Sequence, residues 1–284
     1  MRNHASLLAA FLCLFLCTAR PGHAETKIWS FGVLQVRNAL LTAEYWNPIL
    51  RYVSAKSGVT LELAVVSNAS EHTAKIGDGS YDFAFTNHIF KPRNAAAGYR
   101  VIARTREAPI RGEIVVPFDS PVKSIKDLAG KEVGFPSAAS FVAYAVSFDA
   151  LVRQGIRVTP VFGGNQEGIM VQLKVGRVPA ASVNSQIIKE FAAREHFLYR
   201  VIWQSKEYQN FPVVAHPRVP AKTAAAVTRA LAAMADDPEG LRILQSAANV
   251  VGQKPPLGFL ASSNKEYRNQ WDFFRTTVVP ELKK

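Results

Sequence analysis

Small polar residues stand at the ends of several short apolar segments, and their types suit the binding of an anion. Residues 133–144 read V-G-F-P-S-A-A-S-F-V-A-Y, so an apolar strand stops at Pro136 and serine hydroxyls stand where a helix begins. The first N–H groups of a helix have no acceptor within the helix, and they lie at the positive end of its dipole. Such a turn predicts a binding site for a negatively charged group. A well-capped turn without any ligand has the same pattern, so the turn alone leaves both interpretations open.

Other strand ends supply further hydroxyls, amides and backbone N–H groups. These are the groups with which a binding site forms hydrogen bonds to a ligand. His88 ends one strand, and its type fits a ligand contact and an ordinary surface histidine equally well. The small Ala138 and Ala139 allow a ligand to approach the backbone closely. The predicted ligand-binding residues are Gln35, Thr86, Asn87, His88, Ser137, Ala138, Ala139, Ser140, Phe141, Asn165, Gln166 and Asn184.

Groups for catalysis do not occur in a useful pattern. The histidines lack metal spacing such as H-E-x-x-H, and no serine stands in G-x-S-x-G. The strand ends carry no pair of acids for proton transfer, and G-G-N-Q-E-G at residues 163–168 is not a dinucleotide motif. We therefore expect a protein that is not an enzyme, with no catalytic residue, no metal site and no cofactor.

The first 24 residues have the composition of a secretory signal peptide. Arg2 and His4 precede an apolar run over residues 5–17, and small residues end the segment at Ala24. The run is too short for a comfortable membrane span. Both cysteines, Cys13 and Cys17, lie inside it, so the mature chain has no thiol for disulfides, catalysis or metals. The prediction is an exported, periplasmic protein that is not embedded in the membrane.

The charge of the chain is basic but dispersed. Removing residues 1–24, which contain two arginines and no acid, lowers the formal net charge from +12 to +10. An excess of base suits an anionic ligand. The basic residues form no run and no stripe interleaved with aromatics, so we expect no binding of nucleic acid.

The remaining chain alternates strand and helix signals, which predicts mostly parallel sheets flanked by helices. Asn47-Pro48 is typical of a helix start, so the first helix is placed at 47–56. A helical tail is expected over 221–235, 238–248 and 263–277. Strands are expected at residues 28–34, 60–67, 82–86, 101–105, 113–118, 131–135, 158–162, 180–183, 198–204 and 211–215.

Two such units predict an α/β protein of two lobes. The signal peptide is 1–24, the first lobe 25–108, the second lobe 109–210, and residues 211–284 return to the first lobe with the C-terminal helices. The chain crosses twice, near 105–112 and 205–211, and these crossings form a hinge. Ligands of open α/β sheets bind outside the carboxyl ends of strands, so closure of the lobes would bury one.

Several segments together resemble the PhnD-like family of phosphate, phosphite and phosphonate-binding proteins of ABC transporters. They are W-N-P-I-L-R-Y-V-S-A-K-S-G-V at 46–59, G-D-G-S-Y-D-F-A-F-T-N at 77–87, A-G-Y-R-V-I-A-R at 97–104, D-S-P-V-K-S-I-K-D-L-A-G-K at 119–131, F-P-S-A-A-S-F at 135–141 and A-H-P-R-V-P at 215–220. The resemblance implies a type II periplasmic binding protein fold. It also implies that the helix start at 137–141 holds the ligand, with contacts near Thr86, Asn87, Asn165, Gln166 and residues 182–184.

The chain differs from better-known phosphonate binders at Ala138 and Ala139, where they have hydroxyl residues, and at Asn165, where a histidine is expected. The leading hypothesis is a monomeric periplasmic receptor. It captures a small anion of the phosphonate, phosphite or phosphate class between its lobes and delivers it to an ABC permease. The alternative is a periplasmic sensor component that signals its ligand to a histidine kinase.

Overall fold

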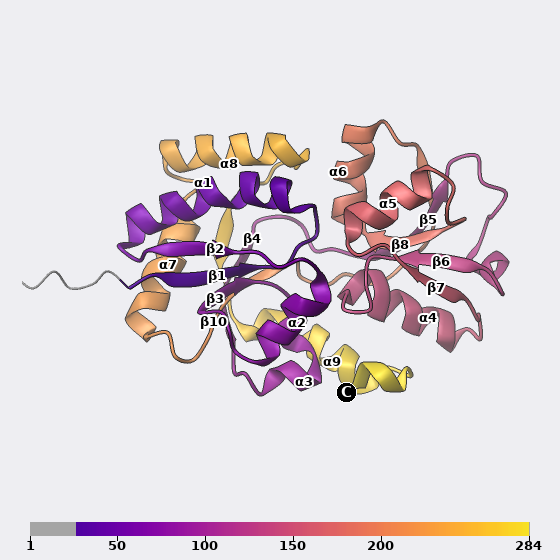
Figure 1. Cartoon of the computed structure of the whole chain (residues 1–284), viewed down its shortest axis with the longest axis horizontal. Helices are drawn as coiled ribbons and strands as arrows, with labels where there is room; N and C mark the ends of the chain where they lie inside the picture. The colour runs from indigo at the N-terminus through magenta and orange to yellow at the C-terminus, as the bar shows by residue number, and fades with distance from the viewer. Residues whose placement is uncertain (1–26, 284) are drawn as a thin grey trace, which may run out of the picture.

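The computed structural model describes residues 27–283, and they form two α/β lobes side by side (Figure 1). The predicted signal peptide lies outside the described residues. The two lobes contain one sheet each, and helices cover both faces of both sheets. The predicted two-lobed α/β fold is confirmed. None of the helices within residues 27–283 has the length and apolar character needed to cross a membrane.

The first lobe is built on a six-stranded sheet of order β11-β4-β10-β3-β1-β2. Its strands are β1 (Trp29–Val33), β2 (Leu61–Ala64), β3 (Phe83–Phe85), β4 (Arg100–Thr105), β10 (Pro212–Ala215) and β11 (Phe259–Ala261). Its helices are α1 (Ala39–Ser57), α2 (Ala69–Gly77), η1 (His88–Phe90), α3 (Pro92–Ala95), α7 (Ala221–Ala233) and α8 (Pro238–Val251). The strand β11 interrupts the tail that was expected to be entirely helical, and it extends the sheet beyond β4.

The predicted helix start at Asn47-Pro48 is wrong. The helix α1 begins well before it, at Ala39. Asn38 is the N-cap, and its side-chain oxygen accepts a hydrogen bond from Leu41 N at 2.9 Å. Pro48 therefore lies inside the helix rather than in its first turn. The interior proline is tolerated because the apolar side of α1 packs against the sheet, and tertiary packing outweighs local preference.

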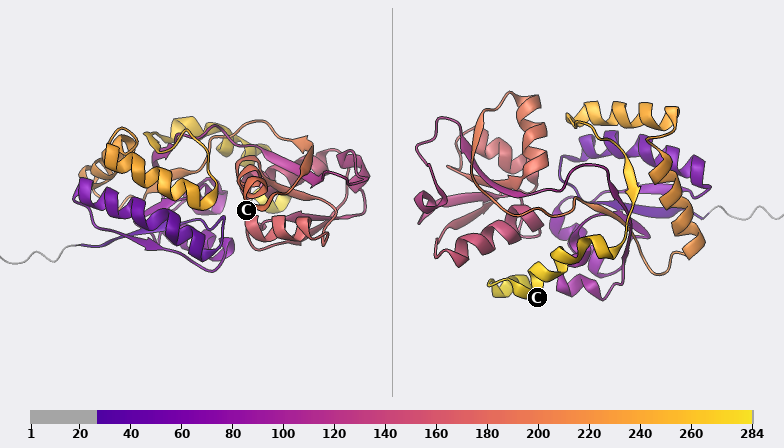
Figure 2. Two further views of the ribbon diagram at one scale, coloured as in Figure 1. Left: turned by 90° about the horizontal axis from the view of Figure 1, so that it is seen from above. Right: turned by 180° about the vertical axis from the view of Figure 1, so that it is seen from behind.

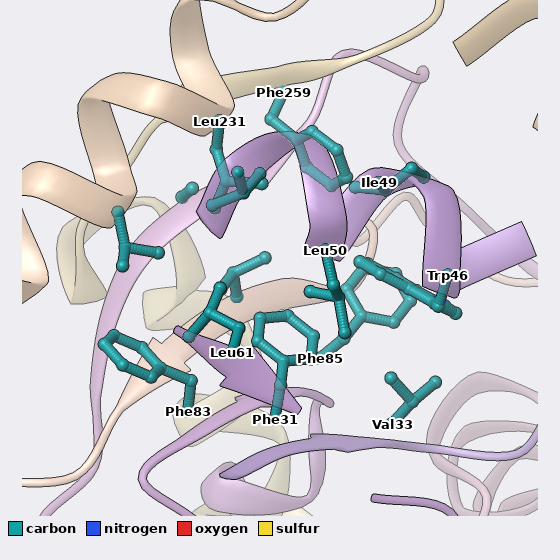
Figure 3. Packing of buried hydrophobic residues seen from close by; sticks show 14 of the residues in the cluster. Phe31, Val33, Trp46, Ile49, Leu50, Leu61, Phe83, Phe85, Leu231 and Phe259 are labelled. Atoms are coloured by element: carbon teal, nitrogen blue, oxygen red, sulfur yellow. The ribbon is translucent and has the colours of Figure 1, made fainter. Parts of the chain in front are cut away.

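A cluster of aromatic and aliphatic side chains fills the space between α1 and the sheet (Figure 3). The Trp46 ring lies 5.3 Å from that of Phe31 and 4.8 Å from that of Phe85, measured between centroids. Leu231 of α7 and Phe259 of β11 close the cluster from the C-terminal part of the chain. Residues far apart in sequence thus form one core, which fixes the end of β3 where Phe85 leads into Thr86 and Asn87.

The second lobe is built on a five-stranded sheet of order β7-β6-β8-β5-β9. Its strands are β5 (Gly112–Pro117), β6 (Glu132–Phe135), β7 (Thr159–Phe162), β8 (Ala181–Asn184) and β9 (Tyr199–Gln204). Its helices are η2 (Ile125–Leu128), the π-helical turn η3 (Phe141–Val146), α4 (Ser147–Arg153), α5 (Gln166–Lys174) and α6 (Ser185–Glu195). Leu151 of α4 packs on one face of the sheet, and Leu173 of α5 and Phe191 of α6 pack on the other.

Both sheets are mixed, whereas the alternation of strands and helices predicts mostly parallel ones. In the first lobe β1 is parallel to β2 and β3, but β10 is antiparallel to β3 and β4. In the second lobe β6 is parallel to β7 and β8, but β5 is antiparallel to β8 and β9. The reason is the crossing of the chain between lobes. A strand that arrives from the other lobe enters its sheet at the cleft, and so it runs against strands that lead toward the cleft.

Two chain crossings connect the lobes, one from β4 to β5 and one from β9 to β10. They are tied together where Ile110 N donates to Tyr208 O at 2.7 Å and Tyr208 N donates to Ile110 O at 2.9 Å. The C-terminal segment, η4 (Asn264–Tyr267), α9 (Arg268–Thr276) and η5 (Pro280–Lys283), is a further link that runs behind both lobes (Figure 2).

This C-terminal segment contacts both lobes through its side chains. Tyr267 stacks on Phe90 of the first lobe with ring centroids 5.2 Å apart. Phe274 lies 5.5 Å from Phe141 of the second lobe, again between centroids. Thr277 Oγ1 donates to the carboxylate of Asp149 on α4 at 2.6 Å. The relative position of the lobes therefore depends on this segment as well as on the two crossings.

Candidate functional site

A cavity of about 20 Å³ lies between the lobes at the ends of β1, β3, β6 and β8. The cavity is lined by Leu34, Gln35, Val36, Ala69, Asn87, His88, Pro136, Ser137, Ser140, Phe141, Val142, Ala143, Asn165, Gln166, Asn184 and Phe211.

The floor of the cavity is the start of the helix that follows β6. Its first turn is π-helical, and the first main-chain hydrogen bond runs from Ala145 N to Ser140 O at 3.0 Å. The N–H groups of residues 141–144 precede this bond, so they have no acceptor within the helix. A π-turn leaves one more such group than an α-helical start would, and π-turns are frequent at functional sites. The geometry suits an anion that accepts several backbone hydrogen bonds.

The two serines at this turn make little use of their hydroxyls within the helix. Ser140 is the N-cap residue, yet its side chain makes no capping hydrogen bond. Ser137 Oγ accepts from Ala139 N at 3.3 Å, and the two serine Oγ atoms lie 3.3 Å apart. Both hydroxyls therefore lie together at the cavity floor, and each can donate to a bound oxyanion when the hydrogen bond between them is exchanged for one to the ligand.

Side-chain amides form the wall on the second lobe. Asn165 caps α5, with its side-chain oxygen accepting from Gly168 N at 2.8 Å. Gln166 accepts from Asn184 N at 3.1 Å, and Asn184 accepts from Gln186 N at 2.8 Å. Because these oxygens are bound to the backbone, the NH₂ groups of the same side chains are the donors that they present.

The wall on the first lobe consists of Gln35, Asn87 and His88. The Gln35 amide, placed with its nitrogen toward Val66 O and Ser67 O, is held by the backbone and acts as a brace between two loops. Asn87 Oδ1 and His88 Nε2 are buried and have no hydrogen-bond partner among the described residues. Buried polar atoms are nearly always paired, so these two acceptors point to a ligand or an ordered water.

Nine of the predicted site residues line this cavity, and three do not. Thr86 is fully buried behind it, where its Oγ1 accepts from His88 N at 3.0 Å. Ala138 and Ala139 line a neighbouring surface groove with Ser70, Thr73 and Lys91. The chain turns at Ser137 so that the alanines point away from the helix start.

A second compartment of the cleft adjoins the cavity and shares Leu34, Val36, Asn184 and Phe211 with it. Arg37 of the first lobe makes a salt bridge across the cleft to Glu190 on α6. No local pattern in the sequence marks either member of this pair. The ion pair holds the two lobes together on this side.

Glu107, on the first crossing, is the other charged group of this compartment, and it was not predicted. Its carboxylate accepts hydrogen bonds from three amides: Gln253 Nε2 at 2.8 Å, Asn210 Nδ2 at 3.1 Å and Gln186 Nε2 at 3.2 Å. These donors come from the first lobe, the second crossing and the second lobe. Burial, and then the charge of Glu190, raise the pKa of Glu107 to about 7. The carboxyl group thus joins both lobes and the hinge.

The cavity itself carries no formal charge, because no Lys, Arg, Asp or Glu is among the residues that line it. Its character comes from backbone N–H groups, hydroxyls and amides. Within residues 27–283, His, Cys, Asp and Glu side chains form no group of three or more that could hold a metal ion. The arrangement can bind a small anion by hydrogen bonds.

A family model described as an ABC transporter, phosphonate, periplasmic substrate-binding protein matches residues 31–258. The match spans both lobes and every residue of the cavity. The chain belongs to this family.

Solved structures of substrate-binding proteins show the same fold as this one. A binding protein component of an ABC phosphonate transporter from Pseudomonas aeruginosa has a TM-score of 0.71 at 14% identity, covering 85% of this chain and 83% of that one. PhnD1 from Prochlorococcus marinus, in complex with methylphosphonate, has a TM-score of 0.72 at 16% identity, covering 88% and 98%. As a substrate-binding component of a transporter, this protein is not an enzyme.

A curated relative of a different class is the tetrathionate sensor histidine kinase TtrS of Salmonella typhimurium, 27% identical over 139 residues. The aligned region is 45% of this substrate-binding protein but only 23% of the kinase. The chain thus spans less than a quarter of that relative.

Proposed function

We propose that this protein captures a small phosphorus oxyanion or organophosphonate in the cavity between its lobes and delivers it to an ABC permease. The ligand's oxygens accept hydrogen bonds from the N–H groups of residues 141–144 and from the hydroxyls of Ser137 and Ser140. The amides of Asn165, Gln166 and Asn184 complete the shell from the second lobe. Asn87 and His88 contact the ligand from the first lobe, and closure of the two walls excludes water.

The observation that supports this proposal most is the π-helical turn at Phe141. It brings unpaired N–H groups and two serine hydroxyls to the floor of the cavity between the lobes. Charged hydrogen bonds of this kind are stronger than neutral ones, and a fixed set of donors needs little reordering when the ligand binds. The site can therefore hold an anion without a basic side chain.

Thermal unfolding with phosphate, phosphite, methylphosphonate and 2-aminoethylphosphonate tests the ligand class. A ligand present at 100 times its dissociation constant adds about 2.7 kcal/mol to the free energy of unfolding. We expect a stabilisation of this size with at least one of the four compounds. Absence of any shift with all four would overturn the phosphorus assignment.

A sensor component that signals to a histidine kinase is the second candidate, and the similarity to TtrS favours it. Tetrathionate added to the same thermal series separates the two ligand classes. Stimulation of a reconstituted permease by the loaded protein would support delivery. Stabilisation by tetrathionate alone would favour the sensor.

The proposal places the working protein in the periplasm as a monomer, after removal of residues 1–24. The family described above is periplasmic, and a single chain forms both walls of the cavity. Mass spectrometry of the exported protein checks the cleavage after Ala24, and light scattering checks the monomer.

A further inference from the structure

The hydrogen bonds of His88 decide which ring nitrogen carries its proton. His88 Nδ1 lies 2.8 Å from Thr73 Oγ1, and the same Oγ1 lies 2.8 Å from the carbonyl oxygen of Ala69. A carbonyl oxygen can only accept, so the single hydroxyl proton of Thr73 goes to Ala69. Thr73 Oγ1 must then accept from His88, which places the ring proton on Nδ1. The other nitrogen, Nε2, is left as a bare acceptor.

The residue that carries this bare acceptor lines the ligand cavity. His88 lines the cavity, is 1% exposed, and its Nε2 is buried with no partner in the part of the chain that the structure describes. The nearby unpaired acceptor Asn87 Oδ1 can turn its amide to present a donor instead. His88 cannot do the same without breaking its bond to Thr73. A ligand that meets this nitrogen must therefore offer it a donor.

The ring does not become a donor by gaining a second proton. Burial, and then the positive charge of Lys91, hold the pKa of His88 well below its ordinary value. The other titratable groups that face it are His72 on α2, whose pKa burial lowers to about 3, and Arg93 on α3. From the second lobe, no titratable side chain lines the cavity. The imidazole is neutral in the physiological range.

The charge balance of the cavity leads to the same requirement. No charged side chain lines it, and the start of a helix offers roughly half an elementary positive charge. A doubly charged oxyanion would be buried without a counter-charge, which is costly. A singly charged oxyanion with one O–H group meets both conditions, because it carries less charge and supplies a donor.

We propose that the site selects the singly protonated form of a phosphorus oxyanion, with its P–OH group donating to His88 Nε2 while its other oxygens accept from the helix start. Thr73 is the positioning residue that fixes the imidazole in this role. This inference rests on the proposed function and names the form of ligand that the same cavity takes. Sulfonates have no such proton near neutral pH, so the site discriminates against them.

The test is calorimetric titration with methylphosphonate and with phosphite across their second pKa values, and with methanesulfonate as the proton-free analogue. Above the second pKa of each ligand, affinity should fall about tenfold per pH unit. The break should come at lower pH for phosphite, whose second pKa is lower. Methanesulfonate should bind about 10- to 100-fold more weakly, because it leaves His88 Nε2 unpaired.

Two ligands are needed because protein groups also titrate in this range. Glu107, with a pKa of about 7, and Lys91, whose pKa burial lowers to about 8, would each produce a break at the same pH for both ligands. A common break, a flat profile, or equal affinity for methanesulfonate would overturn the inference while the proposed function stands. Binding of none of the phosphorus compounds would overturn both.

Thr73→Val separates a positioning role from a purely structural one. Without the hydroxyl the imidazole can move its proton to Nε2 and become a donor, so the pH break should flatten and the discrimination against methanesulfonate should shrink. Thr228→Val is the matched control, since Thr228 Oγ1 makes the same bond to the carbonyl four residues earlier at 2.9 Å. An unchanged break in Thr73→Val would contradict the assignment.

Discussion

At the scale of single residues, the binding proposal depends on serine hydroxyl protons and amide NH₂ groups that can donate to a ligand. Ser137 and Ser140 meet at 3.3 Å at the cavity floor. The second-lobe amides use their oxygens on backbone N–H groups and keep their NH₂ groups for a ligand. Specificity at this scale depends on whether each group acts as a donor or as an acceptor. For His88 this is decided by which ring nitrogen carries the proton.

Replacement of either serine by alanine should weaken binding of the ligand by about 1.5–3 kcal/mol, the range for hydrogen bonds to charged groups. The reason is that each hydroxyl donates to a buried oxyanion. Isothermal titration of Ser137→Ala and Ser140→Ala measures the loss. Ser263→Ala, an exposed serine at the start of η4, is the control and should bind normally. Unchanged affinity in both site variants would place the ligand elsewhere.

At the scale of elements, the position of the π-helical turn depends on Gly112 at the start of β5. A Cβ atom at this position would lie 2.1 Å from Val142 O and 2.8 Å from Ser147 Oγ. The strand and the turn are therefore in direct backbone contact. The helix start points its N–H groups into the cleft because the glycine lets it sit this close to the hinge.

Gly112→Ala should destabilise the protein by about 1–3 kcal/mol through overpacking, and it should also weaken ligand binding because it pushes the turn outward. Gly176→Ala is the matched control. Its φ of +74° makes alanine unfavourable, but the added Cβ meets nothing within 4 Å. Denaturant unfolding measures the stability of both variants, and calorimetric titration measures their affinity for the ligand. A loss of binding in both, or in neither, would contradict the role of Gly112.

Elements were easier to predict from the sequence than contacts between them. The strand before Pro136 and the polar residues at strand ends were found because local chemistry marks them, and nine of the twelve site residues line one cavity. Pro48 misled the prediction because the packing of α1 outweighs local preference. Glu107 and the ion pair of Arg37 with Glu190 were missed because their significance comes from how the lobes meet, which no local pattern records.

At the scale of the whole molecule, the lobes are held together around the cavity by polar contacts on one side and by the C-terminal segment on the other. Arg37 bonds to Glu190 across the cleft, and Glu107 accepts from both lobes. Phe274 and Thr277 attach the C-terminal segment to the second lobe. The contacts that close the lobes therefore include the buried carboxyl group of Glu107. Because burial raises the pKa of this group, the stability of the closed form depends on pH.

The pKa of Glu107 is about 7 in the folded protein, above the value of 4.5 for an exposed glutamate. Folding therefore favours its protonated form. This contribution to stability is fully present below about pH 4.5 and is lost as the pH rises through about 7. Glu107→Gln should remove up to about 1.4 kcal/mol per pH unit from the pH dependence of the unfolding free energy in this window.

Urea unfolding at a series of pH values measures this slope. Glu62→Gln, an exposed substitution on β2, is the control and should keep the slope of the unsubstituted protein. An equal slope in Glu107→Gln would show that the carboxyl group does not titrate with closure.

The most direct measurement is a crystal structure of the protein with methylphosphonate bound. We expect the phosphorus group between the lobes, with its oxygens within hydrogen-bond distance of the N–H groups of residues 141–144 and of the hydroxyls of Ser137 and Ser140. A ligand bound in the compartment of Arg37 and Glu107, with the helix start left unliganded, would contradict the account.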